Sequence, residues 1–186
     1  MQSFAEVVTT RRSIRRFTTQ PVEQEKLDRI LELSRWTPSW ANTQCWEVIV
    51  VTEPSVLEQL AAELSPKNPA SLAMARGPLT LAICGEKKKS GFYKGVQSTV
   101  LGDWLMFDLG LFTQTISLAA HTEGLGSVVA GFFNHEKVRQ LLQVPEMYEV
   151  VALMPMGYPD HAPSAPKRRE AAEFIHYNSF ANKQKN

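Results

Sequence analysis

The chain has 186 residues and carries 20 Lys and Arg against 19 Asp and Glu, for a formal net charge of +1. A chain of this length fits one domain, so we expect residues 1–186 to form one, with 161–186 as an extended C-terminal tail. The near-neutral charge argues against a nucleic-acid-binding module, which usually carries positive charge over the whole domain. Two cysteines are too few for a disulfide framework, and no signal peptide is visible. We therefore expect a cytoplasmic protein with no nucleic-acid partner and no membrane segment.

The first half of the sequence predicts helices in alternation with apolar strands. Ser3 can cap a short first helix, and Pro21 can open a second helix with apolar residues near helical spacing. The β-branched run at 48–51 is typical of a strand that is buried on both faces. A helix from residue 54 to about 64 and an apolar strand at 79–84 are expected next.

The second half is expected to contain one long helix and two further strands. Residues 97–121 are apolar on nearly every face, which predicts a helix through the centre of the assembly. The glycines of 124–126 can end it. A strand is expected at 127–133, a helix capped by Asn134 at 134–142, and a last strand at 150–156. Helices that alternate with strands predict an α/β or α+β fold in which helices cover a sheet.

Four arginines and a serine lie in one short run, Arg11-Arg12-Ser13-Ile14-Arg15-Arg16. A guanidinium group is planar and permanently charged, and it can bind a phosphate through two parallel hydrogen bonds. Taken alone, such a run is usually a solvated surface patch. In a chain with so little net charge, it is also a candidate anion-binding site.

Other sequence features exclude several kinds of chemistry and add two candidate binding segments. Gly124-x-Gly126 lacks the third glycine of a dinucleotide-binding fingerprint, and no phosphate-binding loop with Gly-Lys-Ser/Thr is present. The histidines and cysteines do not have the spacing of metal ligands, so a metal site is not expected. The loop 38–46 combines polar and aromatic residues, and the tail carries the basic run 167–169. Taken singly, a polar loop usually caps the backbone, and a basic tail usually aids solubility.

In their order along the chain, these segments resemble the nitroreductase family of flavin mononucleotide (FMN) enzymes. The family's Arg-x-Ser-x-Arg/Lys segment matches Arg11–Arg15, and its Pro-Ser-x-x-Asn-x-Gln-Pro-Trp loop matches Pro38–Trp46, with Cys45 in place of the proline. Further matches are Gly124-Leu125-Gly126, Gly131-Phe132, Gly157-Tyr158-Pro159 and Lys167-Arg168-Arg169. The resemblance implies an α+β fold with a mixed central β-sheet flanked by helices, and an intertwined homodimer.

The resemblance also implies which residues bind the cofactor. The expected FMN-binding residues are Arg11, Arg12, Ser13, Arg15, Pro38, Ser39, Trp40, Asn42, Gln44, Gly131, Lys167 and Arg169. Arg11, Lys167 and Arg169 would neutralise the phosphate, and Ser13 would donate to the phosphate or the ribityl chain. Arg15 would lie beside N1 and the C2 carbonyl and stabilise the reduced flavin, and Gly131 would lie beside N5. Part of the loop, Pro38 to Asn42, would come from the other subunit.

The activity implied by the resemblance is the reduction of small electron acceptors. NADH or NADPH would deliver a hydride to the flavin, and a nitroaromatic, a quinone or a similar acceptor would then take the electrons, in a ping-pong scheme. No catalytic side chain is expected, because the reaction takes place at N5 of FMN. The same fold also hosts dehalogenation, flavin cleavage and ring oxidation, and these remain alternatives.

Overall fold

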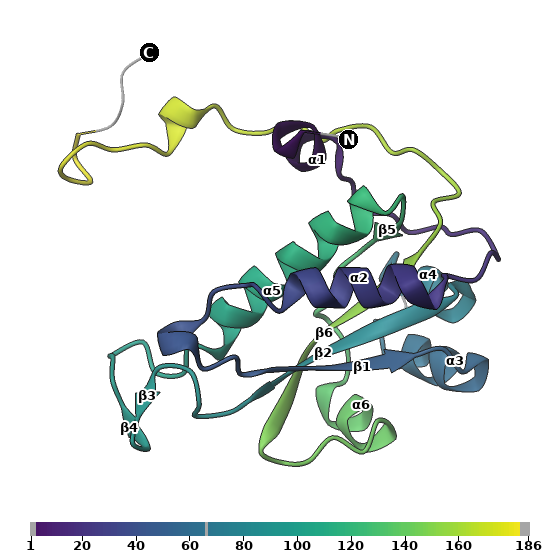
Figure 1. Cartoon of the computed structure of the whole chain (residues 1–186), viewed down its shortest axis with the longest axis horizontal. Helices are drawn as coiled ribbons and strands as arrows, with labels where there is room; N and C mark the ends of the chain where they lie inside the picture. Colours follow the sequence, from purple (N-terminus) through teal and green to yellow (C-terminus); the bar gives the residue numbers. More distant parts are fainter. Residues whose placement is uncertain (1–2, 66, 183–186) are drawn as a thin grey trace.

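A four-stranded antiparallel sheet forms the centre of the computed structural model, in the strand order β1-β2-β6-β5 (Figure 1). The strands are β1 (Trp46–Val51), β2 (Leu79–Glu86), β5 (Gly126–Ser127) and β6 (Tyr148–Gly157). All strand pairs of this sheet are antiparallel, and an isolated parallel bridge joins Ser13 to Ser127 of β5. The structure describes residues 3–65 and 67–182, so the last four residues of the expected tail, 183–186, lie outside it. The α+β fold class is confirmed.

Helices cover both faces of this sheet, and the sheet's alternation of side chains divides the core in two. Leu81 and Ile83 of β2 point to the face that is covered by α2 and α5, while Ala82 and Cys84 point to α3, α4 and α6. The helices are α1 (Phe4–Thr10), α2 (Gln24–Ser34), α3 (Pro54–Ala62), α4 (Ser71–Arg76), α5 (Leu105–Thr122) and α6 (His135–Leu141), with 3-10 turns η1 (Trp40–Asn42) and η2 (Ala171–Glu173). A small hairpin, β3 (Phe92–Tyr93) and β4 (Val96–Gln97), stands apart from the sheet (Figure 1).

Local signals at helix ends are confirmed where the capping chemistry is specific. The Ser3 hydroxyl accepts from the Glu6 backbone N–H, and the Glu6 side chain accepts from the Ser3 N–H, which completes a capping box. The Asn134 side chain caps α6 by accepting from the Lys137 N–H at 3.2 Å. Gly124 ends the turn after α5 with φ 78°, a conformation that glycine adopts without strain.

Four expectations about the burial or the bounds of elements are wrong. β1 is an edge strand that pairs only with β2, and its Val50 is 38% exposed, so it is not buried on both faces. The long helix begins at Leu105 rather than at residue 97, because residue 97 ends the β3–β4 hairpin and residues 98–104 form a non-helical connection. The expected strand 127–133 is reduced to the two residues of β5 and isolated bridges at Ala130 and Phe133. α2 also begins at Gln24, after Glu23, rather than at Pro21.

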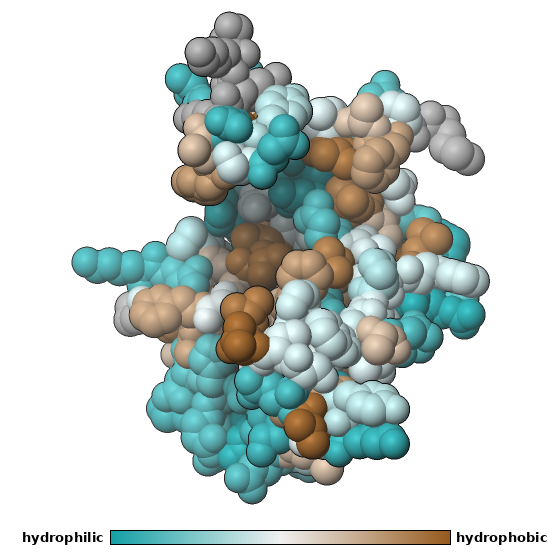
Figure 2. All heavy atoms as spheres, turned by 90° about the vertical axis from the view of Figure 1, so that its left-hand side faces the viewer, coloured by the Kyte–Doolittle hydropathy of each residue, from teal (hydrophilic) through white to brown (hydrophobic). Residues whose placement is uncertain are grey.

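Helix α5 runs along the sheet with one apolar stripe left uncovered in the single chain. Leu109, Phe112 and Ile116 are buried in the core, whereas Met106, Phe107 and Leu111 are exposed. On the left-hand side of Figure 1, where the start of α5 and the hairpin lie, apolar side chains surround a hollow (Figure 2). Among the described residues, no helix has both the length and the apolar character needed to cross a membrane.

Candidate functional site

The arginine-rich run is held against the sheet as an extended segment, and it lines a cavity. The Ile14 backbone N–H donates to the Ser127 carbonyl at 2.9 Å, and the buried Ile14 side chain anchors the run on β5. The cavity has a volume of about 300 Å³, and the C-terminal tail covers one side of it. Its lining is Arg11, Arg12, Ser13, Arg15, Pro163, Ser164, Pro166 and Arg168. The four predicted residues of the first motif are therefore brought together.

The positive charge of this cavity has no neutralising partner within the described part of the chain. None of Arg11, Arg12 and Arg15 forms an ion pair there. Arg12 is held in place by two hydrogen bonds from its Nη1 to the carbonyls of Thr9 and Arg11, both at 2.8 Å. Clustered guanidinium groups with no counter-charge favour a bound anion, above all a phosphate.

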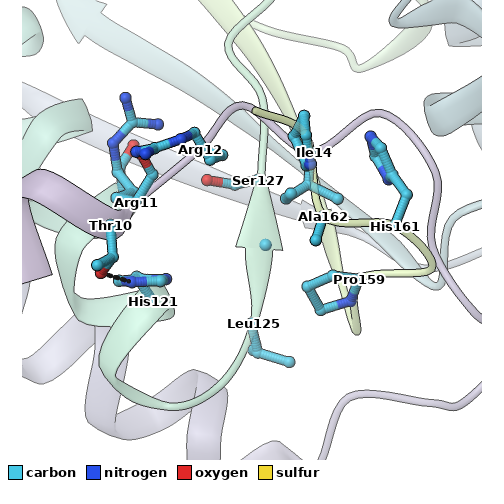
Figure 3. Close-up of a pocket in the computed structure, with 13 residues that line it drawn as sticks. Thr10, Arg11, Arg12, Ile14, His121, Leu125, Ser127, Pro159, His161 and Ala162 are labelled. Carbon is cyan, nitrogen blue, oxygen red and sulfur yellow. Dashed lines mark hydrogen bonds between the residues drawn. The ribbon is translucent and has the colours of Figure 1, made fainter. Parts of the chain in front are cut away.

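A second cavity of about 300 Å³ adjoins the first and shares Arg11, Arg12 and Pro163 with it. In Figure 3, the hydroxyl of Ser127 points toward the arginines, and the side chains of Thr10 and His121 meet below them. The Thr10 hydroxyl and His121 Nε2 are 2.9 Å apart. Burial, followed by the charges of Arg11 and Arg12, lowers the pKa of His121.

The second cavity also has polar side chains in its lining. His161 lines this cavity, and its Nδ1 is buried without a hydrogen-bond partner in the described structure. Together with the hydroxyl groups of Thr10 and Ser127, this ring gives the cavity both donors and acceptors. Such a lining suits a polyhydroxylated chain.

A third cavity of about 370 Å³ continues along α5 and is mainly apolar. It shares Ser117 with the second cavity. Its lining is Met106, Leu109, Gly110, Thr113, Gln114, Ser117, Val129, Gly131, Val151 and Ala152. A Cβ added to Gly131 would meet only the Val151 carbonyl oxygen, at 4.0 Å, so the space above Gly131 is open. A flat ring could approach the backbone there.

The three cavities follow one another, because the first shares residues with the second and the second shares Ser117 with the third; we call this row of cavities the trough. One end of the trough is cationic at Arg11 and Arg168, the middle carries hydroxyl and imidazole groups, and the far end is apolar beside Gly131. This gradient of polarity matches a ligand with an anionic group at one end and an aromatic group at the other.

The predicted loop Pro38–Gln44 does not reach this trough in the same chain. The Trp40 backbone N–H donates to Asp108 in the first turn of α5, whereas the arginines lie beside His121 in its last turn. At about 1.5 Å per helical residue, these two points are about 20 Å apart. Pro38, Ser39, Trp40, Asn42 and Gln44 are therefore separated from Arg11, and none of them belongs to the lining of the three cavities.

The same loop has an unusual backbone. Ala41, Asn42 and Gln44 have φ of 43°, 56° and 48°, in the left-handed region that favours glycine. Ala41 and Gln44 each cost about 1–2 kcal/mol in this conformation, whereas asparagine adopts it readily. Strain of this size is typical of loops whose shape serves a ligand.

The tail places a different basic residue at the cavity from the two expected. Arg168 lines the cavity with Pro166, whereas Lys167 and Arg169 do not. Alternate residues of an extended chain point to opposite sides, which accounts for this pattern. Arg169 instead donates to the Glu173 carbonyl at 2.7 Å. Arg168 lies between Lys167 and Arg169 in the sequence. Only the path of the tail in the structure shows that Arg168, and not its neighbours, lines the cavity.

Other residues of the trough were also missed in the sequence analysis. Thr10, Ser117, His121, Ser127 and His161 line it, yet each is an isolated polar residue in the sequence. Only the fold brings these residues together, because they come from the end of α1, the second half of α5, β5 and the start of the tail. No sequence signal distinguishes them from ordinary capping or core residues.

Comparison with known proteins gives a consistent picture. The model of the nitroreductase family matches residues 8–158. A relative from Methanothermobacter thermautotrophicus, provisionally named an NADH dehydrogenase/NAD(P)H nitroreductase, is 31% identical over 163 residues, which cover 85% of this chain and 78% of the relative. The FMN reductase [NAD(P)H] of Bacillus subtilis is 28% identical over 197 residues, covering 98% of this chain and 76% of that protein.

A solved structure gives the same answer for the fold. The FMN-dependent nitroreductase of Clostridium difficile R20291 superposes with a TM-score of 0.81 at 26% sequence identity, covering 95% of this chain and 100% of that one. The family match spans most of the sequence and includes the arginine run, the loop and the last strand. This chain belongs to the nitroreductase family.

Proposed function

We propose that this protein is an FMN-dependent oxidoreductase that uses NADH or NADPH and acts as a homodimer. The observation that carries the proposal is the trough along α5, which is cationic at one end and apolar beside Gly131 at the other. FMN has the same order of groups, from phosphate through ribityl chain to ring. Relatives named for FMN and for NAD(P)H support this choice of cofactor and electron donor.

The residues present fit each part of this cofactor. Arg11, Arg12 and Arg168, with the Ser13 hydroxyl, would hold the phosphate through charge-assisted hydrogen bonds. The hydroxyl groups of Thr10 and Ser127 lie where the ribityl chain would pass. The apolar third cavity would exclude water from the ring, and the bare backbone at Gly131 leaves room for it.

The chain itself needs to supply little beyond binding and orientation. FMN held in the trough would supply the redox chemistry that links NADH or NADPH to a nitroaromatic, a quinone or a similar acceptor, and the two substrates would use the same open site in turn. Arg15 lines the cationic cavity rather than the apolar cavity beside Gly131, so it would add to the positive charge around the phosphate. The apolar lining on α5 keeps the reacting region dry and strengthens such electrostatic effects.

Three features of the single chain support a dimer. The stripe of Met106, Phe107 and Leu111 on α5 is apolar and exposed, as expected of a surface that a second copy covers. No residue of the Pro38–Gln44 loop lines the trough of its own chain, so a second copy would supply the loop. The tail runs past α1 and away from the body (Figure 1), with Phe174 and Phe180 exposed.

Spectroscopy and rapid kinetics test the proposal directly. The purified protein should bind FMN without a covalent bond, and denaturation should release the flavin. Stopped-flow reduction by NADH and by NADPH would identify the preferred donor. Reoxidation with nitroaromatics, quinones and halogenated aromatics would then separate a nitroreductase from a dehalogenase on the same fold. Apoprotein that does not bind FMN at micromolar concentration would refute the assignment.

A further inference from the structure

Asp108 is a buried carboxylate in the first turn of α5, and the residue is only 1% exposed. Both of its oxygens lie 3.1 Å from the Trp40 backbone N–H. The Ser90 hydroxyl donates to Oδ2 at 2.6 Å. No cation pairs with Asp108 among the described residues. A buried charge of this kind is costly unless it is well hydrogen-bonded, so its neutral donors must satisfy it.

Cys45, where the family commonly has proline, contributes a third donor. Its thiol lies 3.7 Å from Asp108 Oδ2 and is buried. Burial, and then the neighbouring Asp108 carboxylate, raises the pKa of Cys45 to about 12. The thiol therefore keeps its proton at neutral pH, donates to the carboxylate and does not act as a nucleophile.

The segment that Asp108 holds on one side is the strained loop 39–44. Within the loop, the Gln44 backbone N–H donates to the Ser39 hydroxyl oxygen at 2.9 Å, and the Thr43 N–H donates to the Trp40 carbonyl at 2.8 Å. These bonds shape the loop but do not attach it to the rest of the fold. The hydrogen bond from the Trp40 backbone N–H to Asp108 attaches the loop backbone to helix α5, which is rigid.

On its other side, Asp108 holds the segment that carries the β3–β4 hairpin. Ser90 is buried just before this hairpin, and its carbonyl accepts from the Trp104 backbone N–H at 3.1 Å. The Trp104 ring packs against the Trp40 ring with centroids 4.9 Å apart. The loop and the hairpin segment are thus joined through one carboxylate and one aromatic pair.

We propose that Asp108 is a positioning residue for the cofactor site of the partner subunit. It fixes the strained 39–44 loop in the shape that meets the flavin bound at the arginines of the second chain, and it links that loop to the hairpin segment. This inference rests on the proposed function, because it requires an FMN site built from two chains. Asp108 itself lies under the loop and would not touch the cofactor.

The first test is the isosteric variant Asp108→Asn. Its amide keeps the size of the carboxyl group but cannot accept hydrogen bonds from all three donors, so the loop should loosen. We expect FMN to bind about tenfold more weakly, the scale of a lost hydrogen bond to a charged group. Asp103→Asn is the matched control, because Asp103 accepts from Lys88 and Leu105 but has no contact with the loop. Its FMN affinity should equal that of the wild type.

The decisive test is complementation in a heterodimer of Arg11→Ala and Asp108→Asn subunits, isolated with two affinity tags. One site would combine the altered arginine run with the altered loop. The other would combine the intact arginine run of the Asp108→Asn subunit with the intact loop of the Arg11→Ala subunit. Titration of the apo heterodimer should therefore show half of the sites binding FMN with wild-type affinity, although both parent homodimers bind weakly.

A merely structural role for Asp108 predicts a different result. If it supports only its own subunit, both sites of the heterodimer are impaired and no site of wild-type affinity appears, which would overturn the proposal. Unchanged FMN affinity in homodimeric Asp108→Asn would overturn it as well. Should that variant not fold, Ser90→Ala removes the shortest hydrogen bond to Asp108 and should show the same complementation pattern. Wild-type protein that binds no FMN would instead refute the proposed function.

Discussion

The Thr10 hydroxyl lies 2.9 Å from His121 Nε2 and joins the end of α1 to the last turn of α5 beside Arg11 and Arg12. This contact places an imidazole next to the proposed phosphate-binding residues. Burial and the two arginines lower the pKa of His121 below its ordinary value of 6.5. The ring therefore stays neutral to a lower pH in the folded chain than in the unfolded chain.

The pH dependence of stability follows from this lowered pKa. Because the unfolded chain takes up the proton first, the contribution of His121 to folding is complete above pH 6.5 and is lost as the pH falls through its folded-state pKa. His121→Gln should remove that part of the pH dependence in urea unfolding. An NMR titration of the imidazole resonances, assigned with this variant, checks the direction. Titration of His121 above 6.5 in the apoprotein would contradict it.

From the path of the tail, we expect Arg168 to contribute more to FMN binding than its neighbour Arg169. Arg168→Ala should weaken FMN binding by about 1.5–3 kcal/mol, because its guanidinium lines the cationic cavity. Arg169→Ala should have a smaller effect, since its guanidinium is engaged by the Glu173 carbonyl and lies over the Phe174 ring. Fluorescence titration of the two apoproteins measures both. A larger loss for Arg169→Ala would mean that the tail takes another path in the holoprotein.

Two glycines of the trough should respond to alanine in opposite ways. Gly131→Ala places a methyl group in open space, so the apoprotein should keep its free energy of unfolding while FMN binds more weakly. In Gly126→Ala the new Cβ would lie 2.7 Å from Ile14 Cβ, so the apoprotein should lose about 1–3 kcal/mol of stability. Urea unfolding of the apoproteins and FMN titration separate the two effects. Tight FMN binding by Gly131→Ala would place the ring elsewhere.

A charge placed on the exposed apolar stripe of α5, defined above by Met106, Phe107 and Leu111, should weaken the proposed dimer. Leu111 is 36% exposed on this stripe, and Leu111→Glu would bury a charge in the proposed dimer contact, so sedimentation should show a shift toward monomer. Leu72→Glu is the control, because Leu72 is 50% exposed but lies on α4, on the other face of the sheet. Its variant should remain dimeric. A monomeric wild type would refute the dimer outright.

Much of the fold could be predicted because its signals are local. The Ser3 and Asn134 caps and the Gly124 turn depend on a few neighbouring residues, and each was found where expected. The edge position of β1 could not be predicted, since the pattern of a β-branched run does not reveal how many partners the strand will have. The β3–β4 hairpin was missed for a similar reason, because its short strands lie outside any apolar period.

The site was predictable to the extent that it consists of compact motifs. The run from Arg11 to Arg15 is continuous in sequence, so its residues meet in the structure as expected. His121 and His161 are far apart in the sequence, and only the packing of α5 and the tail brings them into one cavity. Asp108 lies within the apolar stretch 97–121, and its role depends on the donors that the fold brings to it.

The distance of about 20 Å along α5 between the arginine run and the Pro38–Gln44 loop has a consequence for how tightly the cofactor is held. In the proposed dimer, each flavin bridges two chains, so cofactor binding and subunit association are thermodynamically linked. Adding FMN should lower the concentration at which the subunits dissociate. Dilution should in turn release flavin, so that the apparent affinity for FMN increases with protein concentration.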